Sequence, residues 1–556
     1  MAADLVIRGG TLIDGTGTPG VAADVAVTDG VISEIGLGLS GTRELDASGC
    51  VVSPGFIDIH THYDAQVFWD PDLTPSSHHG VTTVIAGNCG FSIAPVRPDL
   101  VPLLGRTLQH VEDMSLETLT VGVPWGEFET FPQYLDVVRR RGVGLNFGCY
   151  VGHTATRLYV MGEDGSDRAA SPDELSAMAQ VVDDAMEAGA IGFATSSSPT
   201  HNGDRGRPVP SRLADLAELR ALMAPVGKAG RGVIAMLPGG VFTNQQVFDL
   251  QQEVGRPITW TALLTLKGIP YHEKVVAEHD AARARGVSVW PQVSCRPLVF
   301  QMNLAEPFTL NMRPSFQALM DRPRDERLAS YRDPVWRAAT WAELSGRQRG
   351  VLPANFAALS VAECELHPEL VGRSVPDLAA ERGVTELDVM LDLSLEDDLR
   401  TRFWSVLAND DPDAIAWLLP RDGMLLGLAD SGAHVSQLCD ACFATDLLGN
   451  WVRDREVMPL ERAIHKLTAE PAAVYGLADR GRLAVGLAAD ITVFDPDTVG
   501  PGPLRRLRDF PADGERLTAD RPTGMRHTLV NGVPIRVDER PSVEGLGQRP
   551  GHIVGG

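Results

Sequence analysis

The sequence predicts an α/β protein: a closed (β/α)8 TIM barrel with a small β-sandwich beside it. Three observations support this fold class. Short apolar runs alternate with helical patterns through the middle of the chain, which is typical of a parallel sheet covered on both faces. Both ends of the chain contain short strands joined by Gly and Asp turns. The length of 556 residues, with 44% hydrophobic residues, provides a sizeable core.

The two ends of the chain predict the sandwich. Asp29-Gly30 and Asn531-Gly532 are hairpin-type turns, and each lies among short apolar runs. Neither end has enough apolar surface to fold alone, so we predict one β-sandwich built from residues 1–52 and 480–540. Its strand-like runs are 5–7, 24–27, 31–35, 490–494, 527–530 and 533–537.

Eight strand-like runs predict the barrel within residues 53–479. A capping box that starts at Ser171 begins one of the helices between them, and we expect another helix to begin at Ser211. The strand-like runs are 55–60, 81–86, 143–147, 190–194, 232–236, 258–262, 287–290 and 425–430.

A long insertion follows the seventh predicted strand, over about residues 294–415, and contains helical patterns of its own. At the C-terminal face of a barrel, we expect such an insertion to be a lid-like element that shapes the substrate site. A passive surface decoration is the alternative.

Composition excludes several classes of function. The formal net charge is −24 and the pI is about 5.0, so no basic face of nucleic-acid-binding size is expected. No run is apolar for long enough to cross a membrane, and the N-terminus lacks the pattern of a secretory signal. The seven cysteines, an odd number, indicate reduced thiols in the cytoplasm. We expect a small-molecule substrate and, by default, a homo-oligomer.

The strongest chemical signal is the pair His60 and His62 at the end of the first predicted strand. Strand residues two apart point to the same face, so both imidazoles converge at the mouth of the barrel, where they can bind Zn²⁺ or another divalent metal. Asp430 ends the eighth strand, which is next to the first in a closed barrel. We therefore predict that Asp430 contacts the metal and acts as a general base, with a helix cap as the alternative.

Further candidates follow other predicted strands. Cys89 follows the second strand, where it is either a metal ligand or a small residue in a tight turn. His153 ends the third strand and His201 follows the fourth. Each could bind metal, hydrogen-bond the substrate carbonyl or only satisfy a loop; we favour the carbonyl for His153 and substrate binding for His201. Arg296 follows the seventh strand and is a candidate for binding substrate, with a solvated loop charge as the alternative.

The cysteine pair at 439 and 442 has no partners at the spacing of a zinc site. We interpret it as two buried thiols on a helix.

These segments together resemble the amidohydrolase superfamily, and more closely its N-acyl-D-amino acid deacylase (D-aminoacylase) family. The resemblance spans nearly the whole chain and implies a metal-dependent barrel, a side β-sandwich and hydrolysis of an amide C–N bond. Many members bridge two metals with a lysine from strand four, which this sequence lacks there. D-aminoacylases use a cysteine after strand two, which matches Cys89. The matching segments are 51–64 (with PGFIDIHTH at 54–62), 80–90, 151–153, 190–194 and 481–495.

The sequence departs from the family at one point. The family supplies one metal-binding histidine from strand five and one from strand six, and neither predicted strand contains histidine here. The remaining donors are His60, His62, Asp430 and Cys89, so we expect one Zn²⁺ or similar ion, with His201 or water completing its shell.

The sequence therefore predicts an amidohydrolase that cleaves a small amide by attack of an activated water. In this prediction Asp430 accepts the water proton and delivers it to the leaving nitrogen. Two alternatives stay open: a cyclic amide hydrolase or deaminase on the same scaffold, and a degenerate homologue without activity.

Overall fold

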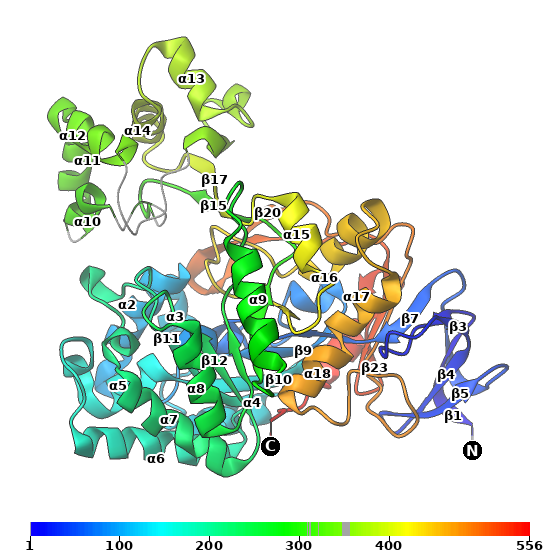
Figure 1. The fold of residues 1–556 in the computed structure, drawn as a ribbon. Helices are drawn as coiled ribbons and strands as arrows, with labels where there is room; N and C mark the ends of the chain where they lie inside the picture. The colour runs from blue at the N-terminus through cyan, green and yellow to red at the C-terminus, as the bar shows by residue number, and fades with distance from the viewer. Residues whose placement is uncertain (1, 308–309, 311–312, 321, 347–355, 556) are drawn as a thin grey trace.

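The computed structural model describes residues 2–307, 310, 313–320, 322–346 and 356–555. Its centre is an eight-stranded, wholly parallel sheet in the order β8-β9-β10-β11-β12-β13-β14-β18 (Figure 1). A parallel bridge between Thr61 and Ser431 joins the two ends of the sheet, which closes the barrel. This confirms the predicted fold class. The strands are β8 Phe56–Asp58, β9 Val81–Ala86, β10 Asn146–Gly152, β11 Gly192–Ser196, β12 Val233–Leu237, β13 Ile258–Trp260, β14 Val289–Val293 and β18 Leu425–Leu426.

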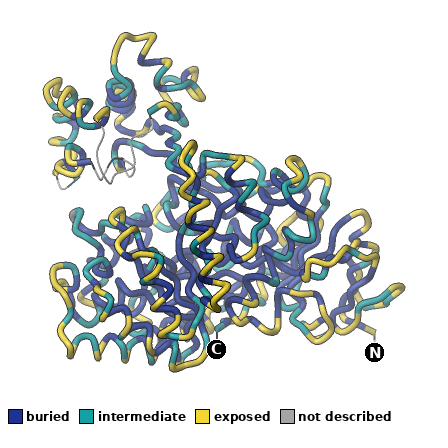
Figure 2. Tube along the Cα trace, in the orientation of Figure 1, coloured by how far each residue is buried: buried dark blue, intermediate teal, exposed yellow. Residues whose placement is uncertain are grey.

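Apolar side chains cover both faces of this sheet, as the near-continuous apolar runs predict. Ile57, Ile85, Ala194 and Val233 belong to one buried cluster, and a larger cluster includes side chains of the surrounding helices. Figure 2 shows the strands as a buried centre within helices that are exposed along one side.

Two predicted strand positions differ from the structure. The third strand was expected at 143–147 but lies at Asn146–Gly152, because Val143 instead bridges to Pro550 and Gly551 of the C-terminal tail. The eighth strand is only two residues long. Beyond it, Leu428 and Asp430 adopt positive φ angles of 59° and 45°, so the chain leaves the ladder before Asp430.

Local end signals explain where the barrel helices begin. Ser171 caps α6 in the predicted capping box with Glu174. The helix expected at Ser211 begins instead at Leu216, because the Asp215 side chain accepts the backbone N–H of Glu218. The main helices are α2 Val101–Glu112, α4 Phe131–Arg141, α5 His153–Met161, α6 Pro172–Ala188, α7 Leu216–Ala229, α8 Asn244–Val254, α9 Tyr271–Arg283, α15 Pro412–Leu418, α17 Leu460–Leu467 and α18 Ala469–Tyr475.

The chain ends form two further sheets that share one apolar core, as predicted for the sandwich. One sheet has the order β5-β4-β1-β6, and the other, β24-β23-β22-β19-β7-β2-β3, combines strands from both ends of the chain. Their bounds are β1 Ala3–Arg8, β2 Thr11–Leu12, β3 Val21–Ala22, β4 Asp24–Thr28, β5 Val31–Gly36, β6 Gly41–Asp46, β7 Val51–Pro54, β19 Ile491–Phe494, β22 Met525–Val530, β23 Val533–Val537 and β24 Arg540–Pro541.

Part of the C-terminal segment lies outside these two sheets. β20 (Arg505–Phe510) and β21 (Gly514–Thr518) form a separate hairpin, and its residues Arg516 and Leu517 line a pocket together with Asp430.

The insertion after β14 has a core of its own and stands away from the barrel in Figure 1. Its neck is fastened by Asn409, whose Nδ2 donates to the carbonyls of Ser294 and Arg296 while its Oδ1 accepts the N–H of Thr265. Its elements are β15 Leu298–Met302, α10 Pro314–Met320, α11 Arg324–Arg332, α12 Pro334–Ser345, β16 Ser360–Glu363, α13 Val375–Arg382, α14 Glu386–Glu396 and β17 Arg402–Ala408.

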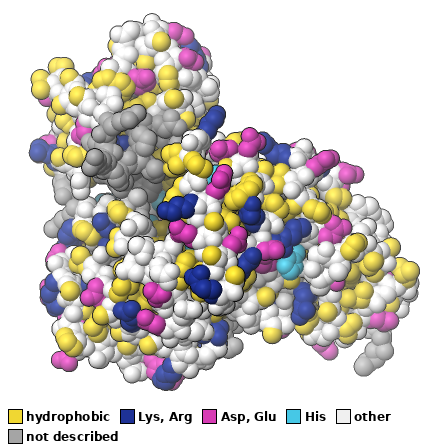
Figure 3. Space-filling model, in the orientation of Figure 1, with side chains coloured by type: hydrophobic (Ala, Val, Ile, Leu, Met, Phe, Trp, Pro, Cys, Tyr) yellow, Lys and Arg dark blue, Asp and Glu magenta, His cyan; other side chains and the backbone are white. Residues whose placement is uncertain are grey.

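In the described part of the chain, no helix combines the length and the apolar character needed to cross a membrane. On the face turned to the viewer in Figure 3, acidic and basic side chains are interspersed.

The short helix η1 (Ser76–His79) generates a prediction about pH and stability. The His79 ring is fully buried; its Nε2 donates to the Ala519 carbonyl at 2.6 Å, and burial lowers its pKa to about 3. An unfolded histidine has a pKa of about 6.5, so protonation favours the unfolded chain as the pH falls from about 6.5 towards 3. Above pH 6.5 this effect is absent.

We therefore expect His79 to account for a loss of about 2 kcal/mol in unfolding free energy between pH 7 and pH 5. Chemical unfolding of His79→Gln, followed by tryptophan fluorescence, should show a shallower pH dependence than the wild type. His367→Gln is the control, because that ring is exposed between Glu369 and Glu396. An unchanged pH dependence in His79→Gln would contradict the prediction.

Candidate metal centre at the barrel mouth

Two imidazoles and one thiol converge at the mouth of the barrel. One donor atom from each of His60, His62 and Cys89 lies within 4.8 Å of the others. Among the described residues, these three side chains form a group that is spaced to hold a metal ion. The histidines follow β8, and Cys89 follows β9. The structure thus brings together three of the ligands predicted from sequence.

Glycines on either side of Cys89 shape the turn that carries it. Cys89 has a φ of 55°, and Gly87 and Gly90 also have positive φ angles. A Cβ at Gly87 would lie 2.6 Å from the Tyr150 carbonyl, which leaves no room for a side chain. Asn88 lies between Gly87 and Gly90. Its Nδ2 is within hydrogen-bonding distance of the carbonyls of Ile59, Thr61 and Ile85, which fixes the turn to the end of β8. The thiol is therefore held beside the two histidines.

Asp430 completes this cluster from the other end of the sheet. Its Oδ1 lies 3.0 Å from His60 Nε2 and 3.8 Å from His62 Nε2. Burial alone raises the pKa of a carboxyl, but the two imidazoles outweigh burial and hold the pKa of Asp430 well below its usual range. Asp430 is consequently a carboxylate that can ligate a cation or accept a proton.

The opposite side of the His60 ring is anchored by polar side chains of the barrel. His60 Nδ1 donates to Gln292 Oε1 at 2.7 Å, and Gln292 Nε2 donates to Thr259 Oγ1, which sets the orientation of the amide. Thr261 Oγ1 is 3.2 Å from the same Nδ1. If a metal ion were bound, a proton on Nδ1 would leave Nε2 free to ligate the ion beside Cys89 and Asp430.

Glu112, the last residue of α2, is a site residue that sequence reasoning missed. Its Oε1 lies 3.2 Å from His62 Nδ1, and both side chains are buried. Burial, together with Asp430 and Asp64, raises the pKa of Glu112 well above its usual range. A carboxylate beside the distal nitrogen of a metal-binding imidazole is a common orienting partner. No local pattern in the sequence marks Glu112, because its approach to His62 depends on how α2 packs.

The donor set fits one divalent cation. Two imidazole nitrogens, one thiol sulfur and one carboxylate oxygen are ligands that Zn²⁺ accepts, and the distal nitrogen of His60 is hydrogen-bonded to Gln292. β12 and β13 contain no histidine, and Trp260 and Thr261 lie at the end of β13. The described residues therefore support a single-ion site more directly than a two-ion site.

His153 lies apart from this cluster. It is the first residue of α5 and is fully buried, with its Nε2 2.8 Å from Glu218 Oε1 and its Nδ1 2.8 Å from Thr195 Oγ1. Arg157 also bonds to Glu218. Both ring nitrogens are thus occupied within a buried network between the barrel and α7, which leaves none for the substrate carbonyl.

His201 lies near the cluster, whereas Arg296 is held by two carboxylates. The His201 ring bonds to Ser196 Oγ at 2.8 Å and packs at a tilted angle against Phe91, and burial with the nearby His434 and His62 lowers its pKa to about 3. Arg296 donates to Asp440 at 2.5 Å and to Asp446 at 3.2 Å. Its charge is thereby neutralised within the protein.

The cysteines at 439 and 442 are both buried, as predicted, but not on a helix. They lie in the loop before α16 (Phe443–Asp446), with Cys442 at its N-cap, because the chain turns there to enter a four-residue helix.

Comparisons with known proteins agree with this geometry. Residues 43–536 match the amidohydrolase family. The chain is 31% identical over 542 residues to a D-aminoacylase of Alcaligenes xylosoxydans xylosoxydans, which covers 96% of this chain and 94% of that protein. A solved D-aminoacylase structure, described for its binuclear metal centre, has a TM-score of 0.68 and 28% identity over 99% of each chain.

An N-acyl-D-glutamate deacylase from Bordetella bronchiseptica, solved with zinc and a phosphonate inhibitor, has a TM-score of 0.69 and 26% identity over 100% of each chain. The full-length match, the shared fold and the histidine pair at the mouth of the barrel lead to one conclusion: this chain belongs to the amidohydrolase family and is related to the D-aminoacylases and N-acyl-D-amino acid deacylases.

Proposed function

We propose that the protein is a metal-dependent hydrolase that cleaves the amide C–N bond of a small N-acylated substrate of the N-acyl-D-amino acid class. The observation that carries the proposal is the convergence of His60, His62, Cys89 and Asp430 at the mouth of the barrel. The relatives support it, since one is a D-aminoacylase and another a deacylase of N-acyl-D-glutamate.

In the proposed mechanism these four residues hold one Zn²⁺ or similar ion. When bound, such an ion supplies Lewis-acid polarisation of a carbonyl and acidifies a water molecule. The Asp430 carboxylate, kept ionised by the two imidazoles, accepts a proton from the attacking water and then donates it to the leaving nitrogen. Gln292 holds the His60 ring in orientation through a hydrogen bond, and the Glu112 carboxyl lies beside the His62 ring.

The other candidates have supporting roles in this proposal. His201 contacts the substrate, because its ring lies near His62 and Asp430. Arg296 acts through Asp440 and Asp446 instead of through the substrate, and the network around His153 fixes α5 and α7 against the barrel. The insertion, fastened at its neck by Asn409, is proposed to cover the mouth.

The first test is metal content. Protein purified without chelator should contain about one equivalent of divalent metal, and His60→Ala should contain less than about a tenth of an equivalent, because one of four ligands is gone. Elemental analysis measures both, with the exposed His367→Ala as the control. Full metal content in His60→Ala would refute the assignment of His60 as a ligand.

The second test removes the proposed base. Asp430→Asn should lower kcat on the best substrate by about 10²- to 10⁴-fold, because the amide cannot accept the proton. Asp422→Asn, an exposed carboxylate paired with Arg462, is the control. The substrate panel comprises N-acyl-D- and N-acyl-L-amino acids and cyclic amides, with ammonia release followed in parallel. Turnover of cyclic amides alone, or ammonia release, would favour the alternative reactions.

The third test concerns Glu112. Because it lies against the distal nitrogen of His62, Glu112→Gln should weaken metal affinity about 10- to 100-fold while the thermal midpoint of the metal-free protein changes little. Titration with Zn²⁺ in a competing chelator measures the affinity. Glu117→Gln, on the exposed side of α3 (Leu116–Gly122), is the matched control. Equal affinities in the two variants would remove Glu112 from the proposed centre.

A further inference from the structure

The loop that begins at Asp430 ends with two thiols that the proposed mechanism does not use. Cys439 and Cys442 are both free and buried, and their side chains interact with each other. The Cys442 thiol donates a hydrogen bond to the Cys439 carbonyl oxygen, 3.6 Å away. The two residues are three apart in one turn, and a disulfide between them requires the two side chains to rotate towards each other.

The surroundings make the two sulfurs different. The Cys439 sulfur lies beside the Cys442 thiol, the Ala519 backbone N–H and the Arg296 guanidinium, three groups that favour its thiolate. The Asp440 carboxylate has the opposite effect and raises the pKa of Cys439. Arg296 is also paired with Asp440 and Asp446. The net result is a lowered pKa for Cys439, whereas the pKa of Cys442, the donor, is raised. Cys439 is therefore the better nucleophile of the pair.

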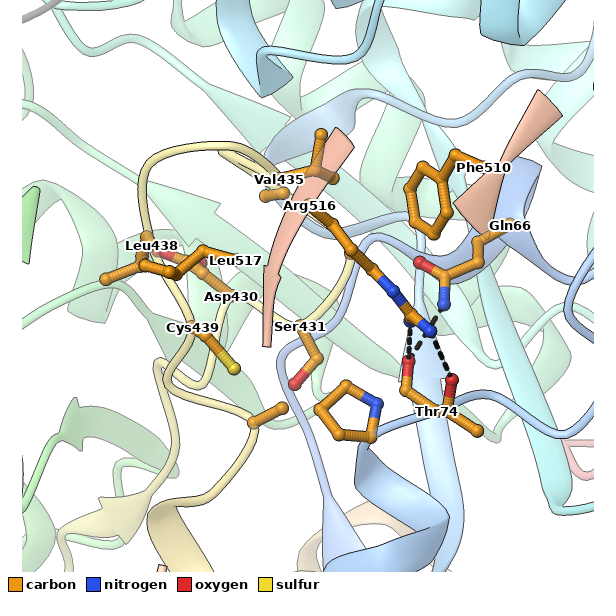
Figure 4. Close-up of a pocket in the computed structure, with 14 residues that line it drawn as sticks. Gln66, Thr74, Asp430, Ser431, Val435, Leu438, Cys439, Phe510, Arg516 and Leu517 are labelled. Atoms are coloured by element: carbon orange, nitrogen blue, oxygen red, sulfur yellow. Dashed lines mark hydrogen bonds between the residues drawn. The ribbon is translucent and has the colours of Figure 1, made fainter. Parts of the chain in front are cut away.

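Cys439 also borders open space. It lines a cavity of about 20 Å³ together with Asp430, Gln66 and Arg516. Figure 4 shows the Cys439 sulfur directed into this cavity, with Ser431 on the neighbouring wall. A volume of this size accommodates a molecule as small as water, and hydrogen peroxide is only slightly larger. The cavity therefore restricts any reagent that meets Cys439 to a very small molecule.

The other cysteines lack this combination of features. Burial raises the pKa of Cys50, and it raises those of Cys89, Cys149 and Cys295 further. A thiol whose pKa is raised has less of the reactive thiolate at neutral pH. Reaction with an oxidant should therefore concentrate at Cys439.

We propose that Cys439 is a peroxide-reactive site and that Cys442 is its resolving thiol. The Cys439 sulfur attacks one peroxide oxygen, the O–O bond breaks, and water leaves with the thiol proton, so that Cys439 becomes a sulfenic acid. The Cys442 thiol then attacks that sulfur and displaces the hydroxyl group as a second water. The sum is two thiols and one hydrogen peroxide giving one disulfide and two waters.

The test is peptide mapping of the reduced, metal-loaded enzyme after exposure to stoichiometric hydrogen peroxide. We expect a Cys439–Cys442 disulfide, seen as the loss of two hydrogen atoms from the peptide that contains both. It should form faster than any oxidation at Cys50, because the pKa of Cys439 is lowered and that of Cys50 is raised, so that Cys439 has more of the reactive thiolate. In Cys442→Ser, a dimedone adduct should accumulate on Cys439.

Two results would overturn the proposal. One is oxidation elsewhere, at Cys89 for example, while Cys439 and Cys442 stay reduced in the wild type. The other is a disulfide-sized mass loss that persists in Cys439→Ser. Cys364→Ser, a buried thiol in the insertion, controls for general effects of a substitution. The readout is the mass of a peptide, so the result of this experiment does not depend on whether the protein has the proposed hydrolase activity.

Discussion

The candidate centre depends on one contact, the closure of the barrel between its first and last strands. His62 donates its backbone N–H to the Ser431 carbonyl at 2.7 Å, and the Ser431 hydroxyl donates to Asp58 on β8. These bonds join segments more than 300 residues apart in the chain. Because Asp430 immediately precedes Ser431, closing the sheet also places its carboxylate against the two imidazoles. The contact that closes the barrel therefore also assembles the candidate metal site.

The electrostatics around this closure favour a cation. Burial raises the pKa values of Asp58 and Asp64 to about 7 and that of Glu112 well above its usual range. Burial is the main cause in each case, because a buried carboxyl loses the solvation of its charged form, and the Asp430 carboxylate adds a like charge near Asp58 and Glu112. A divalent cation bound by Asp430 would offset this negative charge, which supports the same assignment as the ligand set.

Residues that lie at strand ends could be predicted from sequence, because strand order and the two-residue period fix where they point. This rule describes where His60 and His62 lie, whereas Asp430 reaches them through the closure of the barrel, because the chain leaves the β18 ladder before Asp430. The rule was insufficient for His153, because the third strand lies three residues later than expected and His153 already belongs to α5, where its ring meets Glu218. The position of Glu112 beside His62 could not be predicted from sequence, because it arises from tertiary packing alone.

Arg296 illustrates a second limit of sequence reasoning. Its place after the seventh strand was read correctly, but its partners Asp440 and Asp446 come from a loop about 150 residues further along the chain. Composition shows that acidic residues are abundant, yet it does not show which of them will neutralise a particular guanidinium. The cysteine pair is similar, since the Ala519 N–H that distinguishes Cys439 from Cys442 belongs to the C-terminal segment.

The loop from Asp430 to Cys442 connects the two proposals physically. It starts at the candidate base, passes Ser436, which is bonded to Asp113 beside Glu112, and ends at the two thiols. Asp430 and Cys439 face the same cavity. A disulfide at the end of this loop would restrict the torsions of residues 439–442 and withdraw the Cys439 sulfur from its hydrogen bond with Ala519.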